Sequence, residues 1–557
     1  MDREDAPEVA APLDLLLADA AVGLSSRFRP VRLMLALGRR MVAKPDAVGR
    51  RSAELLRELA RISAGSSELE PNPRDRRFAD PAWTGNPLLH RVLQAYLAGS
   101  RAADQLAADV GLDKDERLRF VASNIVDALA PSNNPWLNPA AWKESLDTGG
   151  ANTVRGLRAF IEDMSSSPRV PRMVDPEAYE VGRDLAVTPG SVVWRAPLYE
   201  LIQFTPHTSR VHSSPLLVVP PTINKYYILD LAPHRSLIEF LVGQGHQVFV
   251  MAWRNPDARF RDSGLDAYGA AVVEAVGAVR RICRSAQANL MGVCSGGIIT
   301  SMVMGHLAAT GENSVNALTL LVTVLDQKQA GVAAALIDET TAKAAMAASA
   351  KQGYLDGSAL AEVFAWLRPN DLVWNYWVNN YLLGRKPPAF DILFWNADTT
   401  RMPARMHHDF LRIAMANALV TPGEATMLDT PVDLGKIAAD SYIVAGVADH
   451  ICPWQSCYKT TLLLGGSTRF VLSTSGHIAA LVNPADNPKS SFRAGGDLRA
   501  EADAWSAGAE SHSGSWWLDY AAWLGARSGP QKVAPRRLGG AGFKPQEPAP
   551  GTYVFDR

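Results

Sequence analysis

The spacing of apolar residues changes near residue 190, and this change predicts two kinds of architecture. Before it, leucines recur at helical spacing over residues 47–62 and again over 88–106, and strand-like runs are scarce. After it, short continuous apolar runs alternate with helical stretches. We therefore predict a mostly helical N-terminal domain over residues 1–185 and a domain of alternating strands and helices over 186–530.

The second domain contains six apolar runs that favour buried strands, at residues 216–219, 247–253, 288–290, 318–325, 442–446 and 469–472. Continuous apolar strands separated by helices are typical of a parallel sheet covered on both faces. Residues 326–435 interrupt this rhythm, are rich in aromatic side chains and predict a cap insertion. We expect most of its aromatic side chains to pack as the core of a helical subdomain, and the insertion as a whole to cover a site and exclude water from it. The tail at 531–557, rich in Pro and Gly, predicts little order before its last few residues.

The run from Gly292 to Gly296 (Gly-Val-Cys-Ser-Gly) carries the most informative chemistry. It lies between a predicted strand and a predicted helix, which is the setting of a nucleophile elbow, with Cys294 where most hydrolases have serine. Flanking glycines leave room for the strained turn, and the helix N-terminus favours a thiolate. Taken alone, the same letters also fit a buried structural cysteine. A thiol that attacks a thioester forms another thioester, so cysteine favours acyl transfer over hydrolysis.

Two further polar residues follow predicted strands. Asp449 comes just after the run at 442–446, and His477 just after the run at 469–472. Alone, each would be an ordinary turn or loop residue. The order nucleophile, acid, histidine is that of α/β-hydrolases, so the sequence predicts this fold with Cys294 as nucleophile and His477 as its base. Asp449 would orient the histidine.

Other residues near these three are candidates for the same site. The backbone N–H of Ser295 is the expected first donor to an oxyanion, and Ile223, in the loop after the first predicted strand, the second. His450, beside the acid, and Ala479, two residues beyond the histidine, are candidate substrate-binding residues. The sequence indicates no cofactor and no metal site.

Composition narrows the class of protein. With 47% hydrophobic and 20% charged residues, the chain can build a large core. A net charge of −1 lacks the basic excess of a nucleic-acid-binding protein. The first residues lack the pattern of a signal peptide, and no apolar run reaches the roughly 20 residues that span a bilayer. Four cysteines do not form a disulfide scaffold, which favours a cytoplasmic protein, and we interpret Cys452 and Cys457 as packing residues.

Longer motifs over residues 70–525 carry a family resemblance. Besides the elbow, they are Asp-Arg-Arg-Phe-Ala-Asp-Pro-Ala-Trp at 75–83, Pro-Ser-Asn-Asn-Pro at 131–135, Pro-Pro-Thr-Ile-Asn-Lys-Tyr-Tyr-Ile-Leu-Asp-Leu at 220–231, Asn-Tyr-Trp-Val-Asn-Asn-Tyr-Leu at 375–382, Asp-His-Ile-Cys-Pro-Trp at 449–454, Ser-Gly-His-Ile-Ala at 475–479 and Gly-Ser-Trp-Trp at 514–517. Together they resemble the motifs of single-subunit polyhydroxyalkanoate synthases.

This resemblance implies an acyltransferase that moves (R)-3-hydroxyacyl groups from CoA to Cys294 and into a growing polyester. It also implies a homodimer, attached to polymer granules and their associated proteins, and permits Asp449 a second role in activating the incoming hydroxyl. The length of the acyl chain stays open. Two alternatives remain on the same fold: a thioesterase or polyester depolymerase, in which water replaces the hydroxyl, and a non-enzymatic granule protein, against which the intact Cys294, Asp449 and His477 argue.

Overall fold

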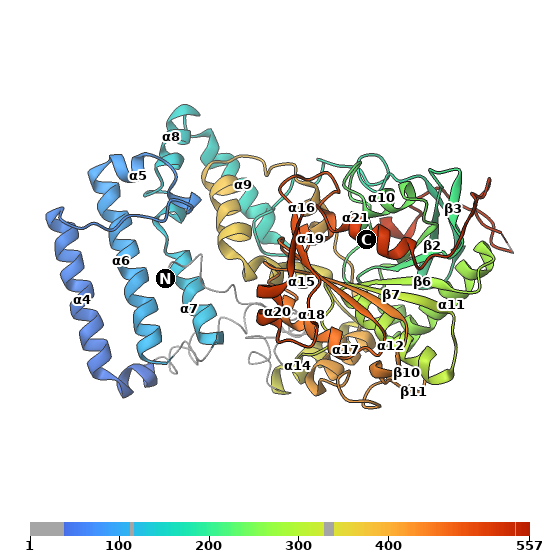
Figure 1. The fold of residues 1–557 in the computed structure, drawn as a ribbon. Helices are drawn as coiled ribbons and strands as arrows, with labels where there is room; N and C mark the ends of the chain where they lie inside the picture. Colours follow the sequence, from blue (N-terminus) through green and yellow to red (C-terminus); the bar gives the residue numbers. More distant parts are fainter. Residues whose placement is uncertain (1–37, 112–115, 328–338, 541) are drawn as a thin grey trace. The chain divides into compact units, whose positions relative to one another are not determined.

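The computed structural model describes residues 38–111, 116–327, 339–540 and 542–557, and their packing forms two units (Figure 1). With those gaps, the first unit comprises residues 38–175 and 358–388. The second comprises 176–357 and 389–557. Residues 358–388 lie inside the predicted insertion yet pack with the helical unit, so the insertion is shared between the two units.

The first unit is helical. Its longest helices, α4 (Pro45–Ala64) and α6 (Pro87–Asp109), extend the predicted helices at 47–62 and 88–106 by a few residues at each end. Both begin with proline, which suits the first helical turn, and Asn86 caps α6 by accepting two backbone N–H groups. A small core contains Phe78, Trp83 and Ala130 together with Leu89 and Leu93 of α6. The remaining helices include α7 (Glu116–Ala128), α8 (Pro139–Asp147) and α9 (Ala151–Ser165).

The insertion's share of this unit comprises α15 (Gly357–Leu367), η6 (Asn370–Trp374) and η7 (Trp377–Leu382). Helix η7 packs closely on α9. The contact leaves no room for a side chain at Gly156, where a Cβ would lie 1.9 Å from the carbonyl oxygen of Tyr381. Phe160 meets Trp377 and Tyr381 edge to face, at centroid distances of 6.0 and 5.4 Å. These aromatic side chains pack as the core of a helical subdomain.

The second unit is built on a ten-stranded sheet in the order β1-β2-β5-β4-β6-β7-β12-β13-β14-β15. Its six central strands are parallel, and each contains or overlaps one of the predicted runs: β4 (Leu216–Val219), β5 (Val248–Trp253), β6 (Ala288–Val293), β7 (Val315–Leu321), β12 (Asp440–Gly446) and β13 (Thr468–Ser473). Helices pack against the sheet, among them α10 (Leu237–Gly243), α11 (Leu265–Cys283), α12 (Ser295–Thr310) and α21 (Trp517–Gly525).

Antiparallel strands complete both edges of the sheet, and the sequence did not predict them. They are β1 (Gly190–Arg195) and β2 (Tyr199–Phe204) on one side and β14 (Ser491–Ala494) and β15 (Glu510–Ser513) on the other. Strand β2 is buried along its whole length although it contains Glu200 and Gln203. Because these polar residues interrupt the apolar run, the sequence pattern does not predict strand β2.

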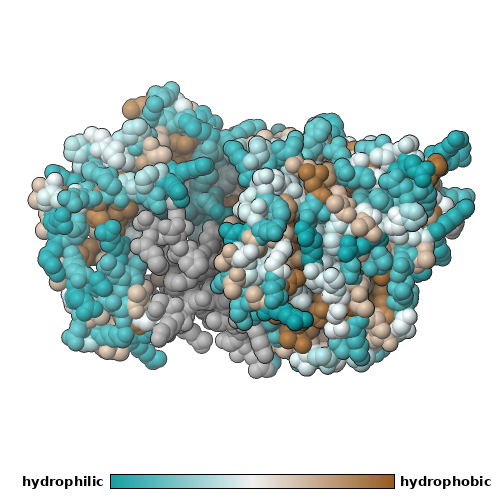
Figure 2. Space-filling view, in the orientation of Figure 1, coloured by the Kyte–Doolittle hydropathy of each residue, from teal (hydrophilic) through white to brown (hydrophobic). Residues whose placement is uncertain are grey.

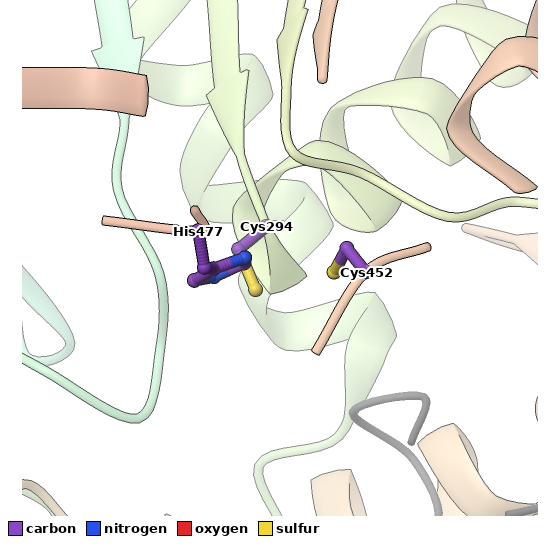
Figure 3. Close-up of side chains that lie close together, drawn as sticks. All are labelled: Cys294, Cys452 and His477. Atoms are coloured by element: carbon purple, nitrogen blue, oxygen red, sulfur yellow. The ribbon is translucent and has the colours of Figure 1, made fainter. Parts of the chain in front are cut away.

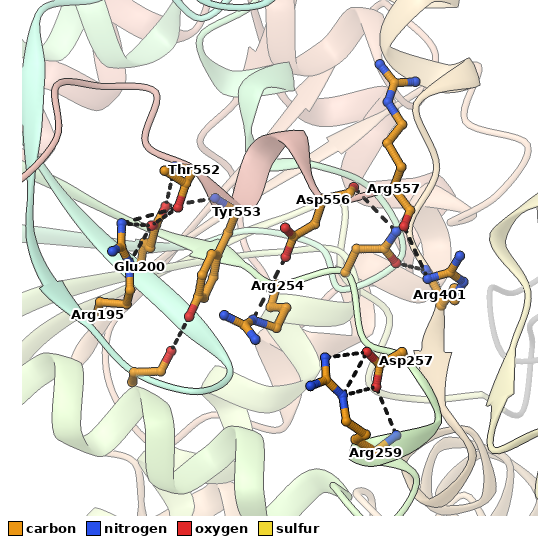
Figure 4. A network of polar contacts seen from close by, with 12 residues as sticks. Arg195, Glu200, Arg254, Asp257, Arg259, Arg401, Thr552, Tyr553, Asp556 and Arg557 are labelled. Atoms are coloured by element: carbon orange, nitrogen blue, oxygen red, sulfur yellow. Dashed lines mark hydrogen bonds and ion pairs between the residues drawn. The ribbon is translucent and has the colours of Figure 1, made fainter.

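The tail at 531–557 is tied to the second unit. Strand β16 (Gln531–Val533) pairs with β3 (Arg210–His212), and Val192 exchanges backbone hydrogen bonds with Gln546 and Glu547. The buried Glu200 carboxylate accepts the N–H groups of Thr552 and Tyr553, as Figure 4 shows. The expectation of little order in this tail was therefore wrong, because buried polar groups of the sheet bind its backbone.

The surface drawn in Figure 2 is mostly polar, with hydrophobic residues scattered among the polar ones. In the part of the chain that the structure describes, no helix is long and apolar enough to cross a membrane.

Candidate active site

The predicted elbow lies where β6 ends and α12 begins. Cys294 separates them with φ 52° and ψ −119°, a left-handed conformation that costs a non-glycine residue strain energy. The two glycines of the motif allow close approach. A Cβ on Gly296 would lie 2.4 Å from the carbonyl oxygen of Pro220, and one on Gly292 would lie 2.1 Å from Oγ1 of Thr300. The turn therefore requires glycine at both positions.

The structure brings Cys294, Asp449 and His477 together. Asp449 and His477 follow β12 and β13, which are adjacent parallel strands, so both residues lie at the same edge of the sheet as the elbow. Nδ1 of His477 lies 2.7 Å from Oδ2 of Asp449. The ligand atoms of His477, Cys294 and Cys452 all lie within 4.8 Å of one another. Figure 3 shows the Cys294 sulfur between the His477 ring and the Cys452 sulfur.

The Asp449 carboxylate is fully enclosed, with 0% of its side chain exposed. Its Oδ1 accepts the backbone N–H groups of Ile451 and Cys452, each at 2.8 Å, while Oδ2 faces His477. Because Nδ1 of the imidazole is engaged by the acid, Nε2 is the nitrogen left for the nucleophile.

The electrostatics of the site favour the charged forms of both Cys294 and His477. The pKa of the Cys294 thiol is lowered to about 5, first by the neighbouring Cys452 thiol and then, against the effect of burial, by His477 and the Ser295 N–H. Burial lowers the pKa of His477, but the charge and hydrogen bond of Asp449, together with Cys294, raise it to about 10. Between these values the pair is a thiolate and an imidazolium, the reactive form of a cysteine nucleophile.

The two predicted oxyanion donors lie on segments that are bonded to each other. Oγ of Ser295 accepts the Thr222 N–H at 3.0 Å, which ties the elbow to the loop that carries Ile223. The Ser295 N–H is close enough to the Cys294 sulfur to lower the pKa of that thiol. The Ile223 N–H has no acceptor among the described residues, and the Ile223 carbonyl accepts the N–H of Thr400 at 3.1 Å.

The other predicted residues have less defined places. His450 is half-buried beside Asp449, and Ala479 is half-buried at the start of α19 (Ala479–Val482). Their contact with substrate stays a prediction.

Sequence reasoning missed Cys452, which we had interpreted as a packing residue. Its sulfur lies in the immediate surroundings of the nucleophile, with only 2% of the residue exposed. Its position three residues after Asp449 was the available signal, because a turn that folds back on the acid brings the third residue near it. Cys457 is buried nearby, and its thiol points to the Cys452 carbonyl at 3.8 Å, as a packing residue does.

Cys294, Cys452 and His477 form the one group of three in the described ranges whose ligand atoms lie close enough to share a metal ion. A cation there would occupy the lone pairs that nucleophilic attack and proton transfer use. The same group contains the predicted nucleophile, Cys294, and its predicted base, His477.

A mixed, mostly parallel sheet with a nucleophile elbow, an acid and a histidine in this order defines the α/β-hydrolase class. Residues 215–484 match the family described as alpha/beta hydrolase fold. Among solved structures, the chain is similar to a hydrolase from Pseudomonas aeruginosa PA01, with 18% identity, a TM-score of 0.31 and coverage of 52% of this chain and 92% of that one.

Comparison with known sequences is more specific. Residues 74–241 match the family described as poly-beta-hydroxybutyrate polymerase (PhaC) N-terminus. The chain is 47% identical to poly(3-hydroxyalkanoate) polymerase 2 of Ectopseudomonas oleovorans over 90% of both chains. It is 41% identical to the poly(3-hydroxyalkanoate) polymerase subunit PhaC of Cupriavidus necator over 88% of this chain and 85% of that one. The chain belongs to the poly(3-hydroxyalkanoate) polymerase family.

Proposed function

We propose that this protein polymerises (R)-3-hydroxyacyl-CoA into polyester through an acyl group carried on Cys294. The observation that carries the proposal is the buried cysteine in the strained elbow, beside a histidine whose other nitrogen is held by a buried carboxylate. Cysteine keeps the acyl group as a thioester, which retains enough transfer potential to form the next ester bond.

The first step loads the enzyme. The Cys294 thiolate attacks the thioester carbonyl of the substrate, and the N–H groups of Ser295 and Ile223 stabilise the oxyanion. The carbon–sulfur bond to CoA breaks, and His477 gives its Nε2 proton to the departing CoA thiolate. The product is a hydroxyacyl-cysteine.

The second step lengthens the chain. The 3-hydroxyl of another acyl unit loses its proton to Nε2 of His477, and its oxygen attacks the thioester carbonyl on Cys294. The carbon–sulfur bond breaks, and the electron pair returns to the Cys294 sulfur. Asp449 acts through His477 in both steps, because its carboxylate is enclosed and already engaged by three N–H groups. We propose that His450 and Ala479, both half-buried, contact the acyl group.

The helical unit offers a surface for the polymer. Val154, Leu157 and Ile161 recur at helical spacing on one face of α9 and are 72, 58 and 59% exposed. An exposed apolar stripe of this kind is typical of a binding surface. We infer that this stripe contacts the polyester granule. We also infer that the enzyme works at the granule as a homodimer, together with granule-associated proteins. Its compartment would be the cytoplasm, where its four free cysteines stay reduced.

The polymerase assay uses purified protein with (R)-3-hydroxybutyryl-CoA and, separately, (R)-3-hydroxyoctanoyl-CoA. Free CoA and the mass of the acyl product are measured, with Cys294→Ala as the matched inactive variant. We expect CoA release with high-mass polyester, lost in the variant, and the better substrate defines the acyl length. Release of CoA with only free hydroxy acid would contradict the proposal and indicate a thioesterase.

Granule association is tested with Leu157→Lys/Ile161→Lys, which adds two charges to the α9 stripe. We expect less protein to sediment with polyester particles while CoA release from soluble substrate is unchanged. Equal sedimentation of variant and wild type would exclude the stripe as the binding surface.

A further inference from the structure

The thiol of Cys452 lies beside the nucleophile, and the proposed reaction leaves it unused. It comes from the loop after β12, immediately before α18 (Trp454–Lys459), whereas the elbow comes from β6. The fold therefore brings two thiols from distant parts of the chain to within 4.8 Å of each other and of the His477 imidazole. Cys294 and Cys452 are 5 and 2% exposed, so little water reaches the space between them.

We propose that Cys452 is a positioning residue that shares its thiol proton with the Cys294 thiolate, on the side away from His477. The inference rests on the proposed role of Cys294 as nucleophile. A buried thiolate needs hydrogen-bond donors in place of water, and a neutral thiol supplies one without adding charge. Figure 3 places the His477 ring and the Cys452 sulfur on either side of the Cys294 sulfur, and the Ser295 N–H is a further donor near it.

The backbone holds Cys452 in this place. Oδ1 of Asp449 accepts the Cys452 N–H at 2.8 Å, while Oδ2 holds the imidazole at 2.7 Å. One buried carboxylate thus positions the two side-chain donors, His477 and Cys452. This arrangement distinguishes Cys452 from Cys457, whose thiol faces a backbone carbonyl instead.

The Cys452 thiol stabilises the Cys294 sulfur most in the step that transfers the polyester chain. As the incoming hydroxyl oxygen bonds to the acyl carbon, the bond from that carbon to the Cys294 sulfur breaks, and the sulfur receives the electron pair. The hydroxyl proton goes to Nε2 of His477. A thiol proton beside the departing sulfur stabilises its new charge, so Cys452 lowers the barrier to releasing the acyl group.

The titratable groups around the nucleophile are His477 and Cys452, with Asp449 and Cys457 behind them. The thiol of Cys452 has a pKa raised well above its ordinary value, by its contact with Cys294 and by burial, so it keeps its proton while Cys294 is ionised.

The test measures the pH dependence of Cys294 alkylation by iodoacetamide, with the adduct located by peptide mass spectrometry. In Cys452→Val the midpoint should rise by about one to two pH units, the value of a hydrogen bond to a charged group. Cys452→Ser restores a donor and should restore the midpoint. Cys457→Ser is the matched control, a buried thiol in the same segment, and should leave the midpoint in place.

An unchanged midpoint in Cys452→Val, or an equal rise in Cys457→Ser, would overturn the inference. If Cys452→Val does not fold, the wild-type S–H stretching band in the infrared gives the answer. Alkylation of Cys294 removes the acceptor and should move the Cys452 band to higher frequency, and an unmoved band refutes the proposal. An active Cys294→Ala would instead refute the proposed function, whereas an inactive one with an unmoved midpoint refutes only this inference.

Discussion

Replacing Asp449 by asparagine tests the electrostatic basis of the site. The substitution keeps the shape of the side chain, but an amide has no charge and only one oxygen. If that oxygen keeps the N–H groups of Ile451 and Cys452, the NH₂ group faces Nδ1 of His477 and forces the proton onto Nε2. Nε2 can then no longer take a proton from Cys294 or from the incoming hydroxyl.

The magnitude follows from the pKa of His477, which rises from 6.5 to about 10 although burial opposes the rise. This difference corresponds to about 5 kcal/mol in favour of the imidazolium, and Asp449 supplies most of it. We expect kcat to fall by about 10³-fold, equivalent to about 4 kcal/mol.

The assay is CoA release under saturating substrate, together with urea unfolding at pH 6 and pH 10. Because folding raises the pKa of His477, its contribution to the free energy of unfolding is complete below pH 6.5 and is lost as the pH rises through about 10. Asp449→Asn should therefore destabilise more at pH 6 than at pH 10. Asp230→Asn is the control, since Asp230 is equally buried but bonded to Thr188 and Ser236. A loss of kcat below tenfold, or equal losses for both variants, would refute the reasoning.

Three further results are expected. The alkylation rate of wild-type Cys294 should rise as the pH passes through about 5, instead of near 9 for an ordinary thiol, because the thiolate is stabilised in the folded protein. Gly296→Ala should lower both Tm and activity, since its Cβ would lie 2.4 Å from the Pro220 carbonyl oxygen. Lys225→Met should cost about 3 kcal/mol in urea unfolding, the low end for a broken buried ion pair, because it removes the amine 3.1 Å from the buried carboxylate of Asp398 but leaves the Tyr227 hydroxyl at 3.0 Å and Arg557 at 4.0 Å.

Each of these three predictions would be contradicted by a specific result. An alkylation midpoint near 9 would exclude a stabilised thiolate. A Gly296→Ala protein with wild-type Tm would show that the elbow has room for a side chain. A Lys225→Met variant as stable as wild type would show that the buried ion pair contributes no net stability.

The six parallel strands could be predicted from sequence, because buried parallel strands are continuous apolar runs. Cys294, Asp449 and His477 could also be predicted, because each comes just after one of these runs. The edge strands could not be predicted, since Glu200 and Gln203 interrupt the apolar run of β2 and bind backbone N–H groups of the distant residues Thr552 and Gly539. The same long-range bonds explain the misjudged tail: the main chain at 552 and 553 is held by a carboxylate about 350 positions earlier in the sequence.

Within the site, the order of Cys294, Asp449 and His477 was readable because it follows the chain. The position of Cys452, three residues after Asp449, indicates that it lies near the acid. It fixes neither the direction of the Cys452 side chain nor its distance from β6. Lys225 was also missed. Its amine is buried and bonded to Asp398 and to the carbonyls of Val554 and Asp556, so its role depends on three segments that meet only in the folded protein.

The loop that carries Ile223 is bonded on one side to the elbow and on the other to the insertion, where Thr400 donates to both Ile223 and Thr222 through its N–H and hydroxyl. If the Ile223 N–H stabilises the oxyanion as we propose, displacing residues 399–400 would move this donor away from the oxyanion. An enzyme opened at this point would admit water but stabilise the tetrahedral intermediate poorly, so hydrolysis would rarely end a chain early. The hydrogen bonds at Thr400 thus bear on a property of the product, the molecular mass that the polyester reaches before it is released.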